Sequence, residues 1–262
     1  MSAKSRIKAL IPRSYYPAAR KLYWWLCAPF YLGNQVYCPC CETHFRRFRT
    51  SRPGGGNQCP RCYAHDRHRL VWLYLHNRTN LFSANLRVLH IAPELSIQKK
   101  LRACPNLDYT SADLNSPLAM VRIDITDIPY SENTVDVILC SHVLEQIPDD
   151  RKAMSELYRI LKPGGWALLP TPLDLERAET FEAPNVVDPE ERRRLFGQAE
   201  YVRIYGRDFT DRLERVGFTV HQEFYAHDLD PVLVQRYGLL EQLDMFYCTK
   251  PTKPQKPFVL AQ

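Results

Sequence analysis

The 262-residue chain has no apolar run long enough to cross a membrane. Its longest such run, Tyr23–Leu32, has about ten residues and is broken by Pro29, whereas a membrane-spanning helix needs about 20. The run also lacks the small-residue cleavage pattern of a secretory signal, and we find no internal repeat or low-complexity tract. Because 45% of the residues are hydrophobic and most cysteines are scattered, we expect a cytoplasmic globular protein with reduced thiols.

Acidic residues are scarce in the first 80 positions, which hold two Asp or Glu residues against fourteen Lys or Arg. The rest of the chain carries 27 acidic and 21 basic residues, so the net charge of +6 conceals a basic front. Over residues 5–32 the basic residues alternate with aromatic ones, a mixture typical of a helix that lies in a lipid headgroup layer or packs on its own domain. The basic front favours an anionic membrane surface or nucleic acid as a neighbour, or is a solvated face.

Four of the nine cysteines form two Cys-x-x-Cys pairs, Cys38 with Cys41 and Cys59 with Cys62. The 17 residues between the pairs give a spacing typical of a zinc site with four thiolate ligands. Such a site has no open coordination position, so we expect the Zn²⁺ to be structural and to take no part in catalysis. The neighbouring Cys40 is a competing ligand in the first pair, and His65 is an alternative fourth ligand.

The sequence divides into five predicted segments. A basic aromatic leader helix over residues 1–34 precedes a small four-cysteine zinc ribbon over residues 35–65. A linking helix over residues 66–85 joins the ribbon to a larger domain over residues 86–250, and a tail follows at residues 251–262.

Short apolar strands alternate with helices in the larger domain. We predict strands at residues 86–91, 107–111, 120–124, 134–140, 166–169, 218–224 and 242–250, and helices at residues 94–103, 149–161 and 208–216. This alternation indicates an α/β fold with a doubly wound, mostly parallel sheet. Residues 171–204 contain no clear strand and are rich in Pro, Glu and Arg, so we expect them to form a lid or an acceptor-binding loop.

One block of sequence carries a resemblance to a known family. It begins Asp124-Ile-Thr-Asp-Ile-Pro-Tyr, continues with Ser141-His-Val-Leu-Glu-Gln-Ile-Pro-Asp, and ends Glu156-Leu-Tyr-Arg-Ile-Leu-Lys-Pro-Gly-Gly-Trp. The block resembles the class I S-adenosylmethionine-dependent methyltransferases, with a resemblance that extends over roughly residues 86–250. Together with the preceding zinc ribbon, it is similar to a bacterial group of zinc-ribbon methyltransferases. The resemblance implies a seven-stranded Rossmann-like sheet and S-adenosyl-L-methionine as the cofactor.

The resemblance also implies positions that bind the cofactor. Asp113, followed by Leu114, ends the second strand, where the family has an acid that accepts hydrogen bonds from the two ribose hydroxyls. Asp124 and Ile125 match the positions that flank the adenine. Ser141 follows the fourth strand, where the family places residues against the methionine part and the acceptor.

The loop after the first strand departs from the family pattern of an acid and a glycine-rich turn. It reads His90-Ile-Ala-Pro-Glu-Leu-Ser96, so that His90 replaces the acid and Ala92 and Glu94 replace glycines. The small Ala92 and Ser96 still permit the cofactor to approach, and Glu94 is placed to turn toward its amino group. The alternative is a crevice that Pro93 and Glu94 partly close.

The first candidate for a catalytic base is His142, which follows the fourth strand. An oxygen or nitrogen acceptor needs a base within hydrogen-bond reach when its methyl group arrives. Tyr205, Asp208 and His221 are weaker candidates, because only chain order places them at the same edge of the sheet.

Three functions are compatible with these features. The first is a methyltransferase that acts on a small-molecule, glycan or lipid-linked acceptor, with the leader at the inner membrane surface. The second is an RNA methyltransferase whose basic zinc module binds phosphate, although the chain lacks an Asn-Pro-Pro-Tyr type of motif after the fourth strand. The third is a non-catalytic scaffold on a degenerate methyltransferase fold.

Overall fold

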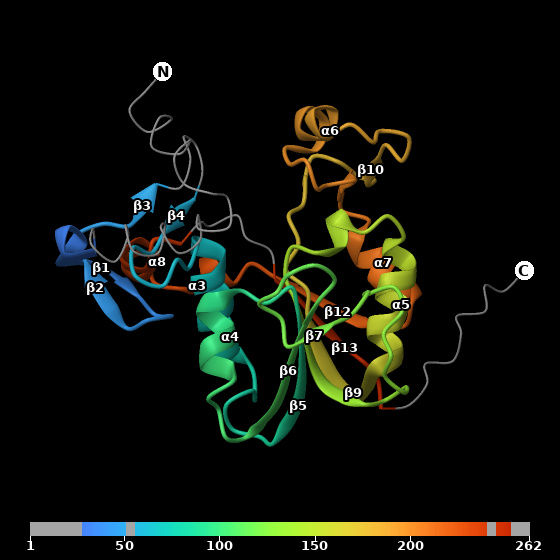
Figure 1. The fold of residues 1–262 in the computed structure, drawn as a ribbon, viewed down its shortest axis with the longest axis horizontal. Coiled ribbons are helices and arrows are strands. Elements are labelled where there is room, and N and C mark those ends of the chain that lie inside the picture. Colours follow the sequence, from blue (N-terminus) through green and yellow to red (C-terminus); the bar gives the residue numbers. More distant parts are fainter. Residues whose placement is uncertain (1–27, 51–55, 240–244, 253–262) are drawn as a thin grey trace, which may run out of the picture.

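The computed structural model describes residues 28–50, 56–239 and 245–252, and its centre is a seven-stranded sheet with helices on both faces (Figure 1). The strand order is β12-β13-β9-β8-β5-β6-β7. Neighbours among β5 to β9 pair in parallel, and β13 is antiparallel to both of its neighbours. The strands are β5 (Leu86–Ile91), β6 (Leu107–Asp113), β7 (Val121–Arg122), β8 (Val135–Cys140), β9 (Leu161–Leu168), β12 (Thr219–Glu223) and β13 (Met245–Thr249). This order confirms the predicted α/β fold with a Rossmann-like, mostly parallel sheet.

The two faces of the sheet are covered by different helices. Helices α3 (Asp66–Arg78) and α4 (Leu95–Leu101) lie on one side, and α5 (Asp150–Ile160) and α7 (Phe209–Arg215) lie on the other (Figure 1). Successive residues of β8 alternate between the two hydrophobic clusters, with Val137 and Leu139 in the first and Ile138 and Cys140 in the second. Such a strand, buried on both faces, reads as a continuous apolar run, which is why the sequence predicted it well.

Helix α5 shows how local sequence sets an element's limits. The side chain of Asp149 caps its first turn by accepting a hydrogen bond of 3.0 Å from the Lys152 N–H. Met154 and Leu157 belong to the apolar stripe that the helix buries against the sheet. The chain turns into β9 directly after Ile160, so the predicted helix and strand are both recovered with shifts of one to five residues.

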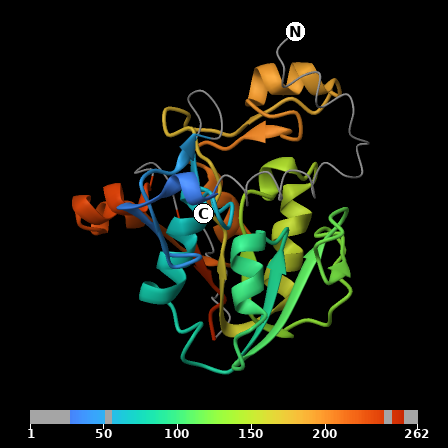
Figure 2. The same ribbon diagram turned by 60° about the vertical axis from the view of Figure 1, so that its left-hand side comes forward.

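The predicted loop at residues 171–204 contains short elements of its own. Strand β10 (Phe181–Glu182) pairs with β11 (Arg203–Ile204), and helix α6 (Pro189–Phe196) lies between them. Figures 1 and 2 show this segment above the upper edge of the sheet. Two-residue strands are too short for hydrophobic periodicity to reveal them, so the sequence predicted only an irregular connection.

The zinc ribbon segment consists of two short antiparallel pairs. After the 3₁₀ helix η2 (Ala28–Tyr31), strand β1 (Leu32–Cys38) pairs with β2 (Thr43–Phe45), and β3 (Arg49–Thr50) pairs with β4 (Asn57–Gln58). The last residues of the predicted leader, 28–34, are therefore a 3₁₀ turn and the start of a strand. The rest of the predicted leader helix lies outside the described residues, as do residues 253–262 of the tail.

The ribbon shares its core with the larger domain. Phe45 and Cys59 belong to the same hydrophobic cluster as Leu70 and Leu75 of α3 and Val137 of the sheet. Helix α8 (Pro231–Tyr237), which the sequence did not predict, contacts strand β1 of the ribbon. Helix α3 therefore packs against both the ribbon and the larger domain. It ends at Arg78, seven residues before the predicted end of the linking helix at residue 85.

Arg69 fixes this junction. Its guanidinium is fully buried and donates hydrogen bonds to the backbone oxygens of Ala64 (2.8 Å), Tyr237 (2.6 Å) and Gly238 (2.8 Å). It also lies 3.9 Å from the centroid of the Phe48 ring. One side chain of α3 therefore satisfies carbonyl groups of the ribbon and of the C-terminal end of α8.

Within the described ranges, every helix is too short or too polar to span a membrane.

Replacing Arg69 by Met should destabilise the protein by at least about 3 kcal/mol, because it removes the donors for several buried carbonyl oxygens. Arg78→Met is the matched control on the same helix, where the arginine forms an exposed ion pair with Asp228. We expect that control to cost less than about 1 kcal/mol. The measurement is urea unfolding of both variants, and equal costs would show that Arg69 does not fix the junction.

Candidate functional site

The carboxyl ends of three neighbouring strands lie level with one another at the upper edge of the sheet. Ile91 at the end of β5 pairs with Ala112 of β6 on one side and with Cys140 of β8 on the other. The residues that follow, Ala92, Asp113 and Ser141, therefore lie side by side at this edge, with Asp113 still paired to Arg122 of β7. The chain also changes direction across the sheet between β5 and β8, which is where open α/β sheets bind ligands.

The loop after β5 contains a buried histidine and glutamate pair. His90 is 2% exposed, with Nδ1 2.9 Å from the Tyr109 hydroxyl and Nε2 2.9 Å from Oε2 of Glu94. Burial, the largest single influence, opposes ionisation of Glu94, but the hydrogen bond from His90, the charges of His68 and His90 and a backbone hydrogen bond together lower the Glu94 pKa to about 2. The carboxylate thus faces His90 in this structure, and its predicted contact with the cofactor's amino group stays a prediction.

Ala92 adopts a backbone conformation that favours glycine. Its φ is 48°, in the left-handed region, and its N–H donates to the Ala112 carbonyl oxygen at 2.8 Å. For a residue with a Cβ this conformation costs about 1 kcal/mol. The sharp turn at the first glycine position of the family is therefore kept without the glycine, and strain of this kind is concentrated at functional sites.

Asp113 is one of the residues that line a cavity of about 370 Å³, which is formed by residues 113–117 and 119–122. Its Oδ1 accepts hydrogen bonds from the N–H groups of Asn115 (2.7 Å) and Ser116 (2.6 Å), which folds the loop around it. Its Oδ2 has no hydrogen-bond partner within the described ranges. Leu114, the next residue, is 43% exposed and lines the same cavity.

The structure does not bring Asp124 and Ile125 to this cavity. The Oδ1 atom of Asp124 accepts hydrogen bonds of 2.8 Å from both the N–H and the hydroxyl of Thr126, and these bonds lower the Asp124 pKa. Ile125 is 4% exposed and belongs to the hydrophobic cluster under α5. The turn that Asp124 caps also explains why β7 is shorter than the strand predicted at residues 120–124.

Two buried hydroxyl groups lack partners beside the crevice. The Oγ atoms of Ser96, at the start of α4, and Ser141, after β8, are inaccessible to solvent and have no hydrogen-bond partner among the described residues. Buried polar groups are nearly always satisfied, so each of these hydroxyls indicates a place for a water molecule or a polar ligand group. The residues present therefore fit a cofactor that carries amino, carboxyl and hydroxyl groups.

His142 and Glu145 lie together just beyond β8. His142 has a φ of 55°, and its Nδ1 is 3.5 Å from Oε1 of Glu145. Glu145 is 1% exposed, yet neither of its carboxylate oxygens has a hydrogen-bond partner among the described residues. Sequence reasoning missed Glu145, although its place three residues after the candidate base was a signal for it.

A second cavity, of about 590 Å³, opens above Glu145. The stretch predicted as an acceptor-binding loop supplies most of its wall, and the 3₁₀ helix η4 (Tyr225–Asp228) and the residue before it close one side. The lining side chains are those of Glu145, Pro172, Leu173, Asp174, Leu175, Glu176, Phe196, Tyr201, Arg203, Ile204, Phe224 and His227.

The weaker candidates for a base do not line this cavity. The buried Tyr205 donates its hydroxyl to Asp150 at 2.8 Å, and Asp208 accepts hydrogen bonds from Thr180 (2.6 Å) and Arg212 (3.0 Å). His221 lies exposed on β12. Their side chains are engaged in the fold or face solvent. His142 does not line the cavity either, but its neighbour Glu145 does, so His142 remains the first candidate for a base.

Arg203 secures the segment that carries Glu145. It is 2% exposed and donates hydrogen bonds to the backbone oxygens of Leu144, Ile147 and Pro148. The N–H of Val202 adds a bond of 2.9 Å to the Glu145 carbonyl oxygen. Strand β11 therefore fixes the 3₁₀ helix η3 (Leu144–Gln146), on which Glu145 lies.

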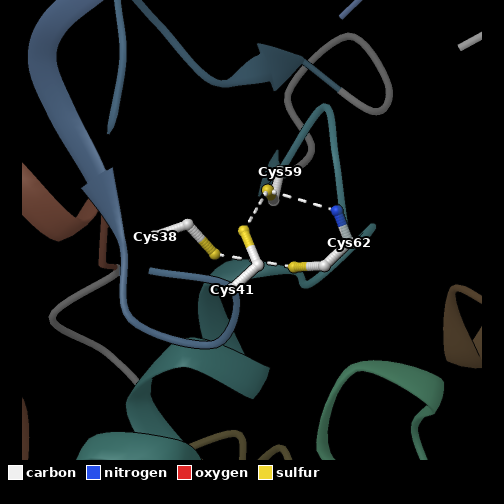
Figure 3. Close-up of side chains that lie close together, drawn as sticks. All are labelled: Cys38, Cys41, Cys59 and Cys62. Atoms are coloured by element: carbon white, nitrogen blue, oxygen red, sulfur yellow. Dashed lines mark hydrogen bonds between the residues drawn. The ribbon is translucent and has the colours of Figure 1, made fainter. Parts of the chain in front are cut away.

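The four paired cysteines converge in the ribbon (Figure 3). Their sulfur atoms lie within 4.8 Å of one another, with 3.6 Å between Cys38 and Cys62 and 3.6 Å between Cys41 and Cys59. A tetrahedral Zn²⁺ with Zn–S bonds of about 2.3 Å needs sulfur atoms about 3.8 Å apart, so the cluster fits this ion. Cys40 instead points its sulfur at the His68 carbonyl oxygen, 3.7 Å away. The His65 ring lies 3.0 Å from the Gln58 amide, so neither alternative ligand joins the cluster.

Stability should depend on pH through Glu94. Its folded pKa of about 2 lies below the ordinary value of 4.5, so ionised Glu94 stabilises the fold above about pH 5. This contribution, about 3 kcal/mol, should be lost as the pH falls from about 5 to about 2. We therefore expect the stability gap between the unmodified protein and Glu94→Gln to shrink over this interval, as measured by urea unfolding. Glu42→Gln, at an exposed ion pair with Lys100, should show a change below about 1 kcal/mol.

If the stability differences of Glu94→Gln and Glu42→Gln from the unmodified protein shrank equally, the contact between Glu94 and His90 would not be the source of the pH dependence.

Comparison with known proteins supports the assignment of the fold. Residues 75–169 match the family model described as "Methyltransferase domain". A chain of the complex that contains the Haloferax volcanii Trm112 methyltransferase activator, together with a protein described as a methyltransferase, superposes with a TM-score of 0.50 at 15% identity. This superposition covers 71% of the present chain and 91% of the other. At that identity, the likeness establishes the fold alone.

Curated relatives match over a shorter segment. An "Uncharacterized methyltransferase" of Mycobacterium sp. (strain KMS) is 41% identical over 49 residues, which are 19% of each chain. A "Ubiquinone/menaquinone biosynthesis C-methyltransferase UbiE" of Idiomarina loihiensis is 39% identical over 49 residues, 19% of this chain and 20% of the other. The chain thus spans about a fifth of the length of the curated relatives it matches. The family match identifies residues 75–169, about a third of this chain, as a methyltransferase domain.

Proposed function

We propose that the protein transfers a methyl group from S-adenosyl-L-methionine to an oxygen or nitrogen atom of a small-molecule, glycan or lipid-linked acceptor. The observation that carries the proposal is the level arrangement of Ala92, Asp113 and Ser141 at the edge of a methyltransferase sheet. The two unpartnered serine hydroxyls and the glycine-like turn at Ala92 support it, because a ligand between the loops accounts for both.

In this proposal, different residues at the carboxyl ends of β5, β6 and β8 bind different parts of the cofactor. Asp113 receives the ribose hydroxyls through Oδ2, and Leu114 packs beside the nucleoside. Ser141 and the turn at Ala92 bind the methionine part of the cofactor. The hydrogen bond from His90 holds Glu94 next to this part. When bound, the cofactor supplies a methyl group on a positively charged sulfur, which is a good leaving group.

The adenine contacts need a change of position. Asp124 and Ile125 remain our candidates for this role, yet one caps its own turn and the other is buried. Their part in binding therefore requires the segment after β7 to shift when the cofactor enters. Leu118 and Met120, which are 49% and 46% exposed near the Asp113 cavity, offer apolar surface at the same place.

His142 is the proposed base. Its Nδ1 lies 3.5 Å from Oε1 of Glu145, and this contact would orient the ring toward an acceptor. The main work of the chain is to align the acceptor with the methyl group and to exclude water, for which the walls from residues 172–204 are suited. Relatives named as C-methyltransferases of quinone biosynthesis add carbon as a second candidate for the atom methylated.

We further propose that the four-cysteine cluster binds a structural Zn²⁺. The ligand set has four thiolates and no open position, so the ion would stabilise the ribbon and take no part in methyl transfer. Contact of the basic leader with an anionic membrane also remains a proposal, since residues 1–27 lie outside the described part of the chain.

Zinc binding is tested by two matched cysteine variants. Cys59→Ser should reduce the metal from about one ion per chain to near zero, because three thiolates bind zinc more weakly. Cys40→Ser should retain the metal, since that sulfur points at the His68 carbonyl oxygen. Elemental analysis by plasma mass spectrometry gives the content, and retention of zinc by Cys59→Ser would contradict the proposed ligand set.

The cofactor site is tested by calorimetric titration with S-adenosyl-L-methionine. Asp113→Asn keeps an oxygen for the loop N–H groups but removes the negative charge, and should weaken binding at least about tenfold. Asp108→Asn, an exposed aspartate near the other end of β6, should bind as the unmodified protein does. Failure of the unmodified protein to bind would favour the scaffold alternative, and equal affinity of both variants would refute the ribose assignment.

A further inference from the structure

Glu145 is a buried carboxylate whose described polar neighbours are the His142 ring, with Nδ1 3.5 Å from Oε1, and Tyr201, whose pKa it helps to raise. Its side chain is 1% exposed and lines the 590 Å³ cavity, and both oxygens lack hydrogen-bond partners among the described residues. An ionised carboxylate in such surroundings is costly unless a donor or cation meets it. The fold nevertheless holds it rigidly, because Arg203 and Val202 bind the backbone of its segment.

Most of the other residues in the cavity wall are apolar or acidic, and the exceptions are Tyr201, Arg203 and His227. Leu173, Leu175, Phe196, Ile204 and Phe224 give it an apolar lining, and Phe224 stacks on His227 with 12° between the ring planes. Such walls suit a ring-sized apolar body.

The charges of the lining favour a donor over an anion. Asp174 and Glu176 add two further carboxyl groups at the wall. Arg203 cannot offset them for a ligand, since its guanidinium already serves three backbone oxygens and lies 3.3 Å from Glu182. A phosphate or carboxylate entering the cavity would therefore meet three carboxyl groups and no available arginine, with the His227 ring, stacked on Phe224, as the one remaining basic side chain of the wall.

We infer that the methyl acceptor has an apolar, ring-sized body and presents an amine or hydroxyl donor to the Glu145 carboxylate. The inference rests on the proposed function and narrows its acceptor class. It disfavours anionic acceptors, including the phosphate backbone of RNA, within this cavity. Glu145 here is a specificity residue: it recognises the donor group that carries or adjoins the atom to be methylated.

Three probes with one body and different head groups test the inference without the cofactor. These are 2-(aminomethyl)naphthalene, which is a cation at neutral pH, 2-naphthol, and the anion 2-naphthoate. Calorimetric titration should show that the amine and the naphthol bind at least about tenfold more tightly than the naphthoate. A hydrogen bond to a buried charged group lowers the dissociation constant by about this factor.

The variant Glu145→Gln should reduce this preference to within about threefold. Glu176→Gln is the matched control, because it removes an exposed carboxylate from the rim of the same cavity and should keep the preference. Glu145→Gln should also melt close to the temperature of the unmodified protein, since it relieves the cost of a buried carboxylate and loses only the 3.5 Å contact with His142.

Several results would overturn the inference. Naphthoate could bind as tightly as the amine, the preference could survive in Glu145→Gln, or neither donor probe could bind at millimolar concentration. A marked fall in the melting temperature of Glu145→Gln would instead assign the carboxylate a structural role. Cofactor titration separates this inference from the proposed function, because Glu145→Gln should bind S-adenosyl-L-methionine normally. Cofactor binding without a donor preference would refute the acceptor class alone.

Discussion

The pairing of β5 with two parallel neighbours governs the arrangement of the crevice. Because Ile91 is in register with both Ala112 and Cys140, three chain segments turn away from the sheet at one level. A shift of one residue in either ladder would reverse which side chains face each cluster, and the buried alternation along β8 opposes such a shift. The hydrophobic contacts on the two faces therefore fix the positions of the polar groups above the edge.

The loop after β5 shows that a glycine-rich turn can be kept by other means. The left-handed backbone at Ala92 is strained, and the hydrogen bond to Ala112 and the buried pair of His90 and Glu94 hold the turn on both sides of it. The charge that the family places on the strand has moved four residues along the chain and is linked back through the imidazole. Tyr109 on β6 completes this arrangement, so the neighbouring strand contributes to the turn.

The sequence predicted the sheet well and the acceptor side of the site poorly. Strand β5 occupies residues 86–91 as predicted, because a parallel strand buried on both faces is a continuous apolar run bounded by turns. The spacing of the two Cys-x-x-Cys pairs likewise predicted that their four sulfur atoms would lie close together. Glu145 was missed because its position depends on a distant residue. Arg203 donates a hydrogen bond to the carbonyl oxygen of Leu144, the residue before Glu145, from 59 residues further along the chain. Residues 171–204 have no periodicity to reveal that contact, and no local pattern marks the cavity that they enclose.

The ribbon and the methyltransferase domain are joined by burial of charge as well as by apolar packing. Burial lowers the pKa of Arg69, and the sulfurs of Cys38, Cys40 and Cys59 and the carboxylate of Asp66 act in the opposite direction. Four thiolates with Zn²⁺ would carry about two negative charges, so the metal-bound cluster supplies a counter-charge for the buried guanidinium. Since Arg69 also binds the end of α8, loss of the cluster would weaken contacts far from the sulfur atoms. Helix α3 then transmits the effect to the sheet face that it covers, while the loops of the crevice are anchored separately by the strand register and by β11.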